Sequence, residues 1–122
     1  MTDSILSVHT LLGTAIPIAG AVVLLKGLYG WFTRDFFTRT DQVLGSLFVG
    51  LLDLTLLVGI VLLITGTVPG GIHLFVMLGV VFAAHGSRVL ARRKDAGERH
   101  LHQAMEALAI ALMVLIFGVF YY

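Results

Sequence analysis

Four long apolar stretches, separated by short polar or glycine-rich segments, dominate the pattern of hydrophobic and polar positions along the chain. They cover about residues 4–29, 43–65, 71–90 and 99–122. A helix that crosses a bilayer needs roughly 20 mostly apolar residues. Each stretch meets that length, so the pattern predicts an all-α protein with four membrane-spanning helices.

The segments between these stretches are short. The first is polar with aromatic residues (TRDFFTRTDQ, 33–42), the second is rich in Gly and Pro (TGTVPGG, 65–71), and the third is charged (ARRKDAGER, 91–99). Short connections make each helix antiparallel to the next. We therefore expect residues 1–122 to form one domain, an up-down four-helix bundle, with spans one and three diagonally opposed.

Composition points to lipid as the surrounding solvent. The chain has 122 residues, of which 58% are hydrophobic and 12% charged, against about 45–50% and 25% in soluble proteins. A soluble domain of this size cannot bury so much apolar surface. Cysteine is absent, which excludes disulfides, thiolate metal sites, iron–sulfur clusters and c-type haem attachment. The net charge of +1 gives no reason to expect a nucleic-acid partner.

The basic residues predict the orientation. All eight lie at the first or third junction, which an up-down bundle places on one side: Lys26, Arg34, Arg39, Arg88, Arg92, Arg93, Lys94 and Arg99. By the positive-inside rule this side faces the cytoplasm. We therefore expect a multi-pass protein of the cell (inner) membrane, with loops 30–42 and 91–99 cytoplasmic and both termini on the non-cytoplasmic side. No Lys or Arg precedes the first apolar run, so we expect that run to be retained rather than cleaved.

Histidines occur at two predicted depths. His9 and His73 lie about one turn inside the outer ends of spans one and three, whereas His85, His100 and His102 lie near the cytoplasmic side. Haem iron takes axial imidazole ligands, and facing helices of a bundle commonly hold a cofactor. We therefore expect one or two b-type haems, the outer one ligated by His9 and His73, the inner one by His85 and either His102 or His100. The rotation of about 120° between His73 and His85 predicts that His73 faces span one and His85 faces span four.

Neighbouring residues refine the inner site. His100 and His102 point about 160° apart, so only one of them can face the core. His102 shares its face with Glu106, and a carboxylate can orient a ligand histidine. This favours His102 and leaves His100 as the alternative. Arg88 lies at the inner end of span three, where its guanidinium suits a haem propionate.

One face of span one is smooth. His9, Gly13, Gly20 and Gly27 fall within about 40° of each other on an ideal helix. Small residues at this spacing let helices pack closely in lipid. The same smooth face could instead admit a flat macrocycle beside the histidine, so both interpretations of Gly13 and Gly20 stay open.

The layout of His9, His73, His85 and His100 or His102 on three helices of the predicted bundle resembles the membrane four-helix b-type cytochromes, including the cytochrome b561 kind and the core of respiratory cytochrome b. The resemblance covers the whole bundle and rests on histidine positions. Those proteins often pair two histidines on each of two helices, whereas span one here offers only His9. The resemblance implies electron transfer across or along the membrane, with quinone or a redox protein as partner. A quinone would bind at the inner interface, in contact with Lys26, Tyr29, Trp31 and Arg34.

Two acidic residues support other functions. Asp53 lies near the middle of span two and Glu106 in the inner half of span four. An ionisable residue at membrane depth marks a candidate functional site, so a small proton- or cation-coupled transporter is one alternative. A structural role for Asp53, hydrogen-bonded to a neighbouring helix, is another. The chain could also be a non-catalytic subunit or homo-oligomer that packs through its glycine faces, and a chlorin could replace haem.

Overall fold

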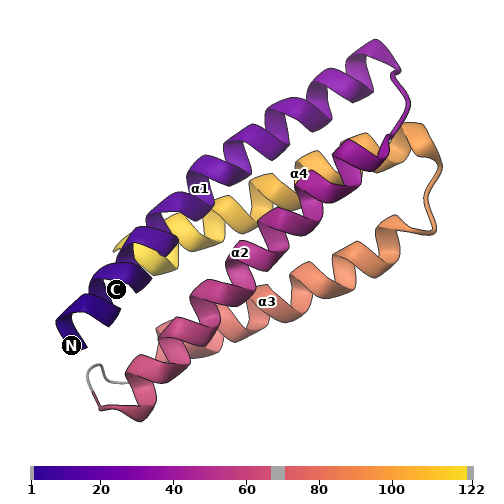
Figure 1. The fold of residues 1–122 in the computed structure, drawn as a ribbon. Helices are drawn as coiled ribbons and strands as arrows, with labels where there is room; N and C mark the ends of the chain where they lie inside the picture. Colours follow the sequence, from indigo (N-terminus) through magenta and orange to yellow (C-terminus); the bar gives the residue numbers. More distant parts are fainter. Residues whose placement is uncertain (1, 67–70, 121–122) are drawn as a thin grey trace.

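The chain folds as an all-helical bundle in a computed structural model that describes residues 2–66 and 71–120 (Figure 1). No strand occurs within these two ranges, so the predicted all-α class is confirmed. The elements are α1 (Thr2–Thr33), α2 (Arg39–Ile64), α3 (Ile72–Ala91), α4 (Ala96–Val114) and a π-helical continuation of α4, η1 (Leu115–Phe120).

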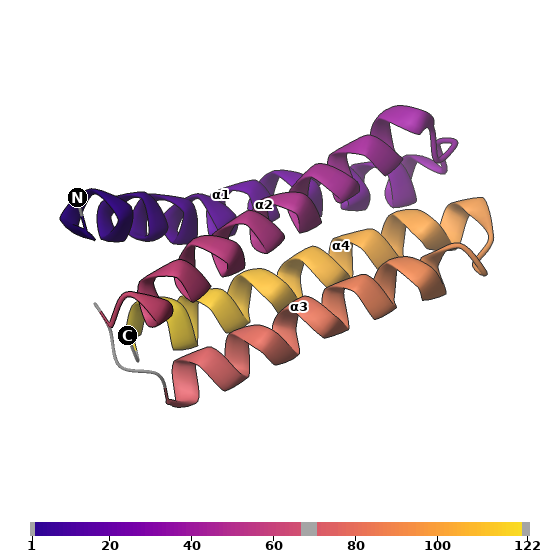
Figure 2. The same cartoon turned by 60° about the horizontal axis from the view of Figure 1, so that its bottom comes forward.

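Successive helices run in opposite directions (Figures 1 and 2). α1 packs mainly against α4 and α2, and α3 packs against the same two helices, so α1 and α3 are diagonal. The α1–α2 and α3–α4 connections lie together at one end, which we call the basic end. The start of α1 and the end of η1 lie at the other end, which we call the opposite end.

The polar ends of the helices extend beyond the predicted apolar spans. α1 runs to Thr33 rather than residue 29, and α2 begins at Arg39 rather than residue 43. At the start of α2, Thr38 and Asp41 form a capping box, in which each side chain accepts a hydrogen bond from the other's backbone N–H. Such a cap fixes a helix start in residues that are too polar to count as a span. Within the predicted turn at 65–71, residues 67–70 lie outside the described chain, as do residues 121–122 of span four.

The end of α1 is closed by a Schellman motif. Arg34 adopts the left-handed conformation with φ 55°. The backbone N–H of Asp35 donates to Gly30 O at 3.0 Å, and that of Arg34 donates to Trp31 O at 3.3 Å. The chain therefore turns sharply after α1, and this turn brings the Asp35 carbonyl to the start of α4.

A seam of small residues joins α1 to α4. A Cβ atom at Gly20 would lie 2.9 Å from Ala111 Cβ, and one at Gly27 would lie 2.8 Å from Ala104 Cβ. The α4 backbone therefore occupies the space that these two glycines leave. The expectation that Gly20 makes room for a macrocycle is wrong, because α4 fills that room. At Gly13 a Cβ would meet nothing within 4 Å, so this position lies beyond the seam.

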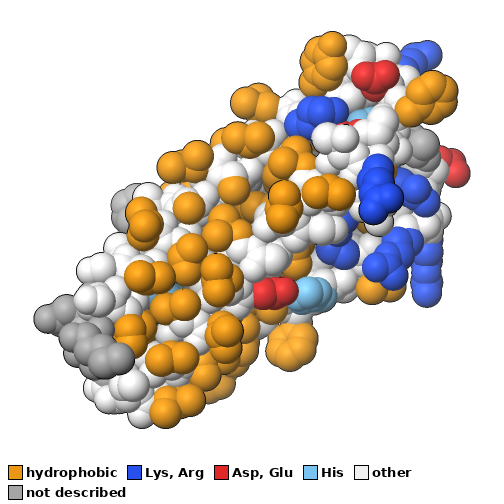
Figure 3. All heavy atoms as spheres, in the orientation of Figure 1, with side chains coloured by type: hydrophobic (Ala, Val, Ile, Leu, Met, Phe, Trp, Pro, Cys, Tyr) orange, Lys and Arg blue, Asp and Glu red, His pale blue; other side chains and the backbone are white. Residues whose placement is uncertain are grey.

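Large hydrophobic side chains cover the outside of the bundle along its length, and Lys and Arg side chains gather at one end (Figure 3). Each of the four helices is long and apolar enough to cross a membrane, and the two shortest of these candidate spans, Ile72–Ala91 and Glu98–Phe117, each have 20 residues. The predicted number of helices that are long and apolar enough to span a membrane is therefore confirmed.

The seam predicts a sharp contrast between two glycines on the same helix. Gly27→Leu would drive a side chain into Ala104 and the His100 carbonyl, and overpacking of this kind costs about 1–3 kcal/mol. We expect the detergent-solubilised variant to unfold several degrees below the wild type in a thermal melt. Gly13→Leu, the matched control, should have the same melting temperature as the wild type. Equal melting temperatures for all three proteins would contradict the close approach of α1 and α4.

Candidate functional site

Polar side chains inside the bundle gather at three levels. The opposite end holds two histidines, the middle holds an Asp–His pair, and the basic end holds a network that includes Glu106, Arg88 and Gln103. Among the described residues, no group of three or more His, Asp or Glu side chains is placed to hold a metal ion. A metal-centred cofactor would therefore depend on a pair of ligands.

His9 on α1 and His73 on α3 meet across the bundle diagonal. Their ring centres are 6.4 Å apart and the ring planes cross at 79°. His9 Nδ1 lies 3.1 Å from Thr55 O on α2, and His73 Nδ1 lies 2.9 Å from Phe117 O on η1. A carbonyl only accepts, so Nδ1 is the protonated donor in each ring, and the lone pair of the neutral imidazole lies on Nε2.

Backbone features fix both rings. Gly59 lies one turn after Thr55, and a Cβ there would be 3.0 Å from His9 Cε1. The glycine therefore lets the imidazole lie against α2 and reach the Thr55 carbonyl. Phe117 lies in the last helical turn, and its carbonyl accepts a hydrogen bond from His73 Nδ1.

Asp53 and His85 form a pair between α2 and α3. His85 Nε2 lies 2.9 and 3.0 Å from the two carboxylate oxygens of Asp53, and the side chains are 55% and 42% exposed for His85 and Asp53. The prediction that His85 faces span four is wrong. A charge-assisted hydrogen bond to the carboxylate of span two directs the imidazole to the other neighbour of α3.

Glu106 and His102 on α4 both meet Ser87 on α3. The Ser87 hydroxyl donates to Glu106 Oε2 at 2.9 Å, while His102 Nε2 lies 2.9 Å from Ser87 Oγ and 3.0 Å from Ser87 O. His102 Nε2 is 3.8 Å from Glu106 Oε2. The carboxylate and the imidazole thus share a face, as expected, with Ser87 between them. His85 and His102 point to different partners, so the structure does not bring them together as an inner ligand pair.

His100 is buried where α4 begins. It is 1% exposed, its Nε2 donates to Asp35 O at 3.1 Å, and its ring packs edge-on against Phe37. The ring also fills the space beside Gly30 that a Cβ would need. Within the described chain its Nδ1 has no hydrogen-bond partner. His100 therefore tethers the α1–α2 connection to α4, and protein atoms enclose it, which does not suit an alternative haem ligand.

At the basic end, four side chains link all four helices in one chain of hydrogen bonds, which we call the polar clamp. Lys26 Nζ on α1 lies 2.6 Å from Asp41 Oδ1 on α2. Gln103 Nε2 on α4 donates to Asp41 O at 2.9 Å, and Arg88 Nη1 on α3 donates to Gln103 Oε1 at 2.8 Å. Asp41 and Gln103 are both buried.

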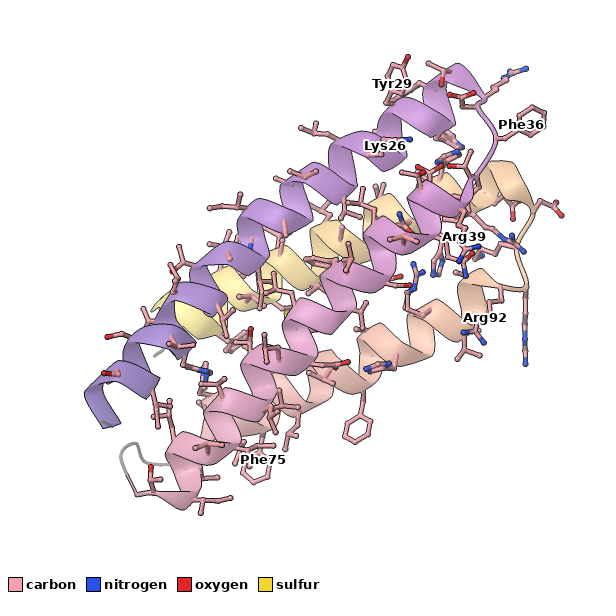
Figure 4. All side chains as sticks on the ribbon, in the orientation of Figure 1. Lys26, Tyr29, Phe36, Arg39, Phe75 and Arg92 are labelled. Atoms are coloured by element: carbon pink, nitrogen blue, oxygen red, sulfur yellow. The ribbon has the colours of Figure 1, made fainter. Side chains whose placement is uncertain are left out.

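The polar clamp changes the interpretation of two candidate residues. Arg88 also donates to Gln42 O and Ser46 Oγ, so its guanidinium joins helices instead of facing a propionate. Lys26 turns to Asp41, whereas Tyr29 projects outward from α1 (Figure 4). The residues proposed to meet a quinone therefore point in different directions.

Sequence reasoning missed Gln103 and Asp41. The signal for Gln103 was an uncharged polar side chain within predicted span four, and that for Asp41 was a Thr-x-x-Asp capping pattern at 38–41. Their partners depend on helix rotation, which the sequence does not specify.

Comparison with known proteins finds no matching protein family, no similar curated protein and no similar solved structure. The chemistry available to these polar groups is therefore argued from their own contacts. The most distinctive of them is the pairing of His9 with His73.

The polar clamp predicts that Gln103 is a major stabilising residue. Gln103→Leu would leave Asp41 O and one Arg88 N–H without their partners, and each lost partner at a buried polar group costs about 1–3 kcal/mol. We expect a lower midpoint of thermal unfolding in detergent. Met105→Leu, at an exposed position of the same helix, should melt with the wild type. A Gln103→Leu protein as stable as this control would show that the clamp is dispensable.

Proposed function

We propose that this protein is an integral-membrane b-type cytochrome in which His9 and His73 hold the iron of one haem and which carries electrons in the membrane. The observation that carries the proposal is the diagonal histidine pair, with ring centres 6.4 Å apart and Nδ1 of each ring bonded to a backbone carbonyl. Bound haem supplies reversible one-electron chemistry.

Membrane insertion is supported by the four long apolar helices and by the hydrophobic side chains on their outer surface. With the basic end in the cytoplasm, as the positive-inside rule requires, loops 30–42 and 91–99 are cytoplasmic. The histidine pair then lies near the non-cytoplasmic face of the cell membrane, and so do both ends of the chain.

The spacing of the two imidazoles would allow both to hold one metal ion. A metal–imidazole bond is about 2.0–2.1 Å long, so two imidazoles that shared one metal would lie close together, as His9 and His73 do with ring centres 6.4 Å apart.

The backbone supports the same role. A ligand histidine almost always donates its other ring N–H to a carboxylate, a carbonyl or water, which fixes the tautomer and the ring orientation. The carbonyls of Thr55 and Phe117 accept such bonds from His9 and His73. Gly59 keeps space for the first of these rings. One haem fits better than two, because His85 and His102 are bound to Asp53 and Ser87.

A proton-coupled function is the second candidate. Its support is that both intramembrane acids meet an imidazole: Asp53 pairs with His85, and Glu106 is linked to His102 through Ser87. Carboxylate and imidazole groups at membrane depth suit proton transfer. Proton uptake by protein-loaded liposomes, abolished by Asp53→Asn in a colourless protein, would favour this function over electron transfer.

An absorption spectrum tests the haem proposal. Protein purified from haem-replete cells should show a Soret band and a sharp α-band on reduction. His9→Ala and His73→Ala should each remove most of both bands, because one axial ligand does not retain the cofactor at this site.

The matched controls are His85→Ala and His102→Ala, which should keep the bands at wild-type intensity relative to protein. A colourless wild-type protein would refute the proposal. Loss of the bands in the controls but not in the His9 or His73 variants would move the site to the inner group, and far-red absorption would indicate a chlorin.

A further inference from the structure

We infer that the basic end carries a binding site for one anionic phospholipid, in a groove between the start of α2 and the start of α4. The groove has a volume of about 590 Å³ and is lined by Phe37, Arg39, Val43, Ser46, Leu47 and Arg99, together with Thr38 and Gln42. This inference rests on the membrane placement proposed above but not on the haem.

The charged part of the groove is suited to a phosphodiester. Arg39 and Arg99 both line it, and none of its lining residues is acidic. Asp41, next to Gln42 in the sequence, is buried and already paired with Lys26, and Glu98, next to Arg99, is exposed and does not line the groove. The whole end carries eight basic residues against five acids (Asp35, Asp41, Asp95, Glu98 and Glu106), a local balance of 8 − 5 = +3. A guanidinium binds phosphate oxygens through two parallel N–H donors.

Arg99 is held in place for this role. Its Nε donates to Ala91 O and its Nη2 to Arg92 O, so one edge of the guanidinium is fixed to the α3–α4 connection. Arg88 reaches the same wall of the groove through Gln42 O and Ser46 Oγ. The charge of Arg99 is therefore positioned by the fold, and binding a phosphate to it does not require that side chain to become ordered.

The other part of the groove is apolar and leads away from the charges. Val43 and Leu47 are one turn apart on α2, and their side chains are 46% and 65% exposed. Val43 and Leu47 follow Arg39 by about one and two turns along α2, toward the middle of that helix. A headgroup at the arginines would thus place its acyl chains along Val43 and Leu47. Basic pockets between spanning helices on the cytoplasmic side bind anionic lipid headgroups in this manner.

Native mass spectrometry in a neutral detergent tests the site with phosphatidylglycerol as the probe. We expect the wild type to retain one phosphatidylglycerol, and Arg39→Gln/Arg99→Gln to bind it at least tenfold more weakly. The control Arg93→Gln/Lys94→Gln removes the same charge from exposed positions outside the groove and should bind within twofold of the wild type. Phosphatidylcholine should bind all three proteins weakly.

Equal weakening in the groove and control variants would overturn the inference, because it would show a diffuse effect of charge. Displacement of the lipid by millimolar inorganic phosphate would also overturn it, in favour of a free-anion site. If the double variant misfolds, Arg39→Gln alone keeps the Arg99 contacts and should still weaken binding at least threefold. The haem bands should be unchanged in every variant. A colourless protein that retains the lipid would refute only the haem proposal, whereas release of the protein by alkaline carbonate would refute membrane placement itself.

Discussion

Asp41 is the residue through which the four helices are joined. Its carboxylate caps α2 with Thr38 and pairs with Lys26 of α1, while its carbonyl accepts the Gln103 amide of α4, which in turn holds Arg88 of α3. Because the same side chain fixes where α2 begins, it also fixes which residues of α2 lie at each depth. Thr55, the partner of His9, is fourteen residues further along, about 21 Å on an ideal helix. The geometry of the histidine pair therefore depends on a cap at the other end of the bundle.

Different kinds of interaction hold the four helices in the bundle. α1 and α4 meet through glycine and alanine, so their backbones approach closely over several turns. α3 buries only Val80 and Ala84 among its described side chains, yet hydrogen bonds tie it to the other helices along its length. These are made by His73, His85, Ser87 and Arg88. In an apolar surrounding, where hydrophobic burial does little to hold helices together, small-residue packing and interhelical hydrogen bonds are the available forces. α3 depends mainly on the second.

The helices could be predicted from the sequence because hydropathy and length are properties of a single segment. His9 and His73 were predicted at matching depth from the fixed rise per residue, and they do meet. His85, expected near the cytoplasmic side with His100 and His102, lies instead at the middle level beside Asp53. The partner of His85 could not be predicted. Helix geometry sets the angle between His73 and His85 on α3 at about 120°. The rotation of α3 about its own axis is not set in this way, and it decides whether His85 faces Asp53 on α2 or faces α4. The packing of Gly20 against α4 could not be predicted for a similar reason, because a glycine-rich face of one helix does not reveal which group packs against it.

The five histidines are best separated by the nitrogen that each one uses. In His85, His100 and His102, Nε2 bonds to Asp53, to Asp35 O and to Ser87 O, respectively. In His9 and His73, Nδ1 bonds to a carbonyl. An imidazole bound through Nδ1 to a carbonyl can add a metal at Nε2 and keep its existing hydrogen bond, which the metal then strengthens. An imidazole bound through Nε2 must either give up that bond or turn its Nδ1, which lies next to its own backbone, toward the metal. His9 and His73 are thus the two histidines that face each other with Nδ1 bonded to a carbonyl, whereas the other three use Nε2 to hold helix contacts.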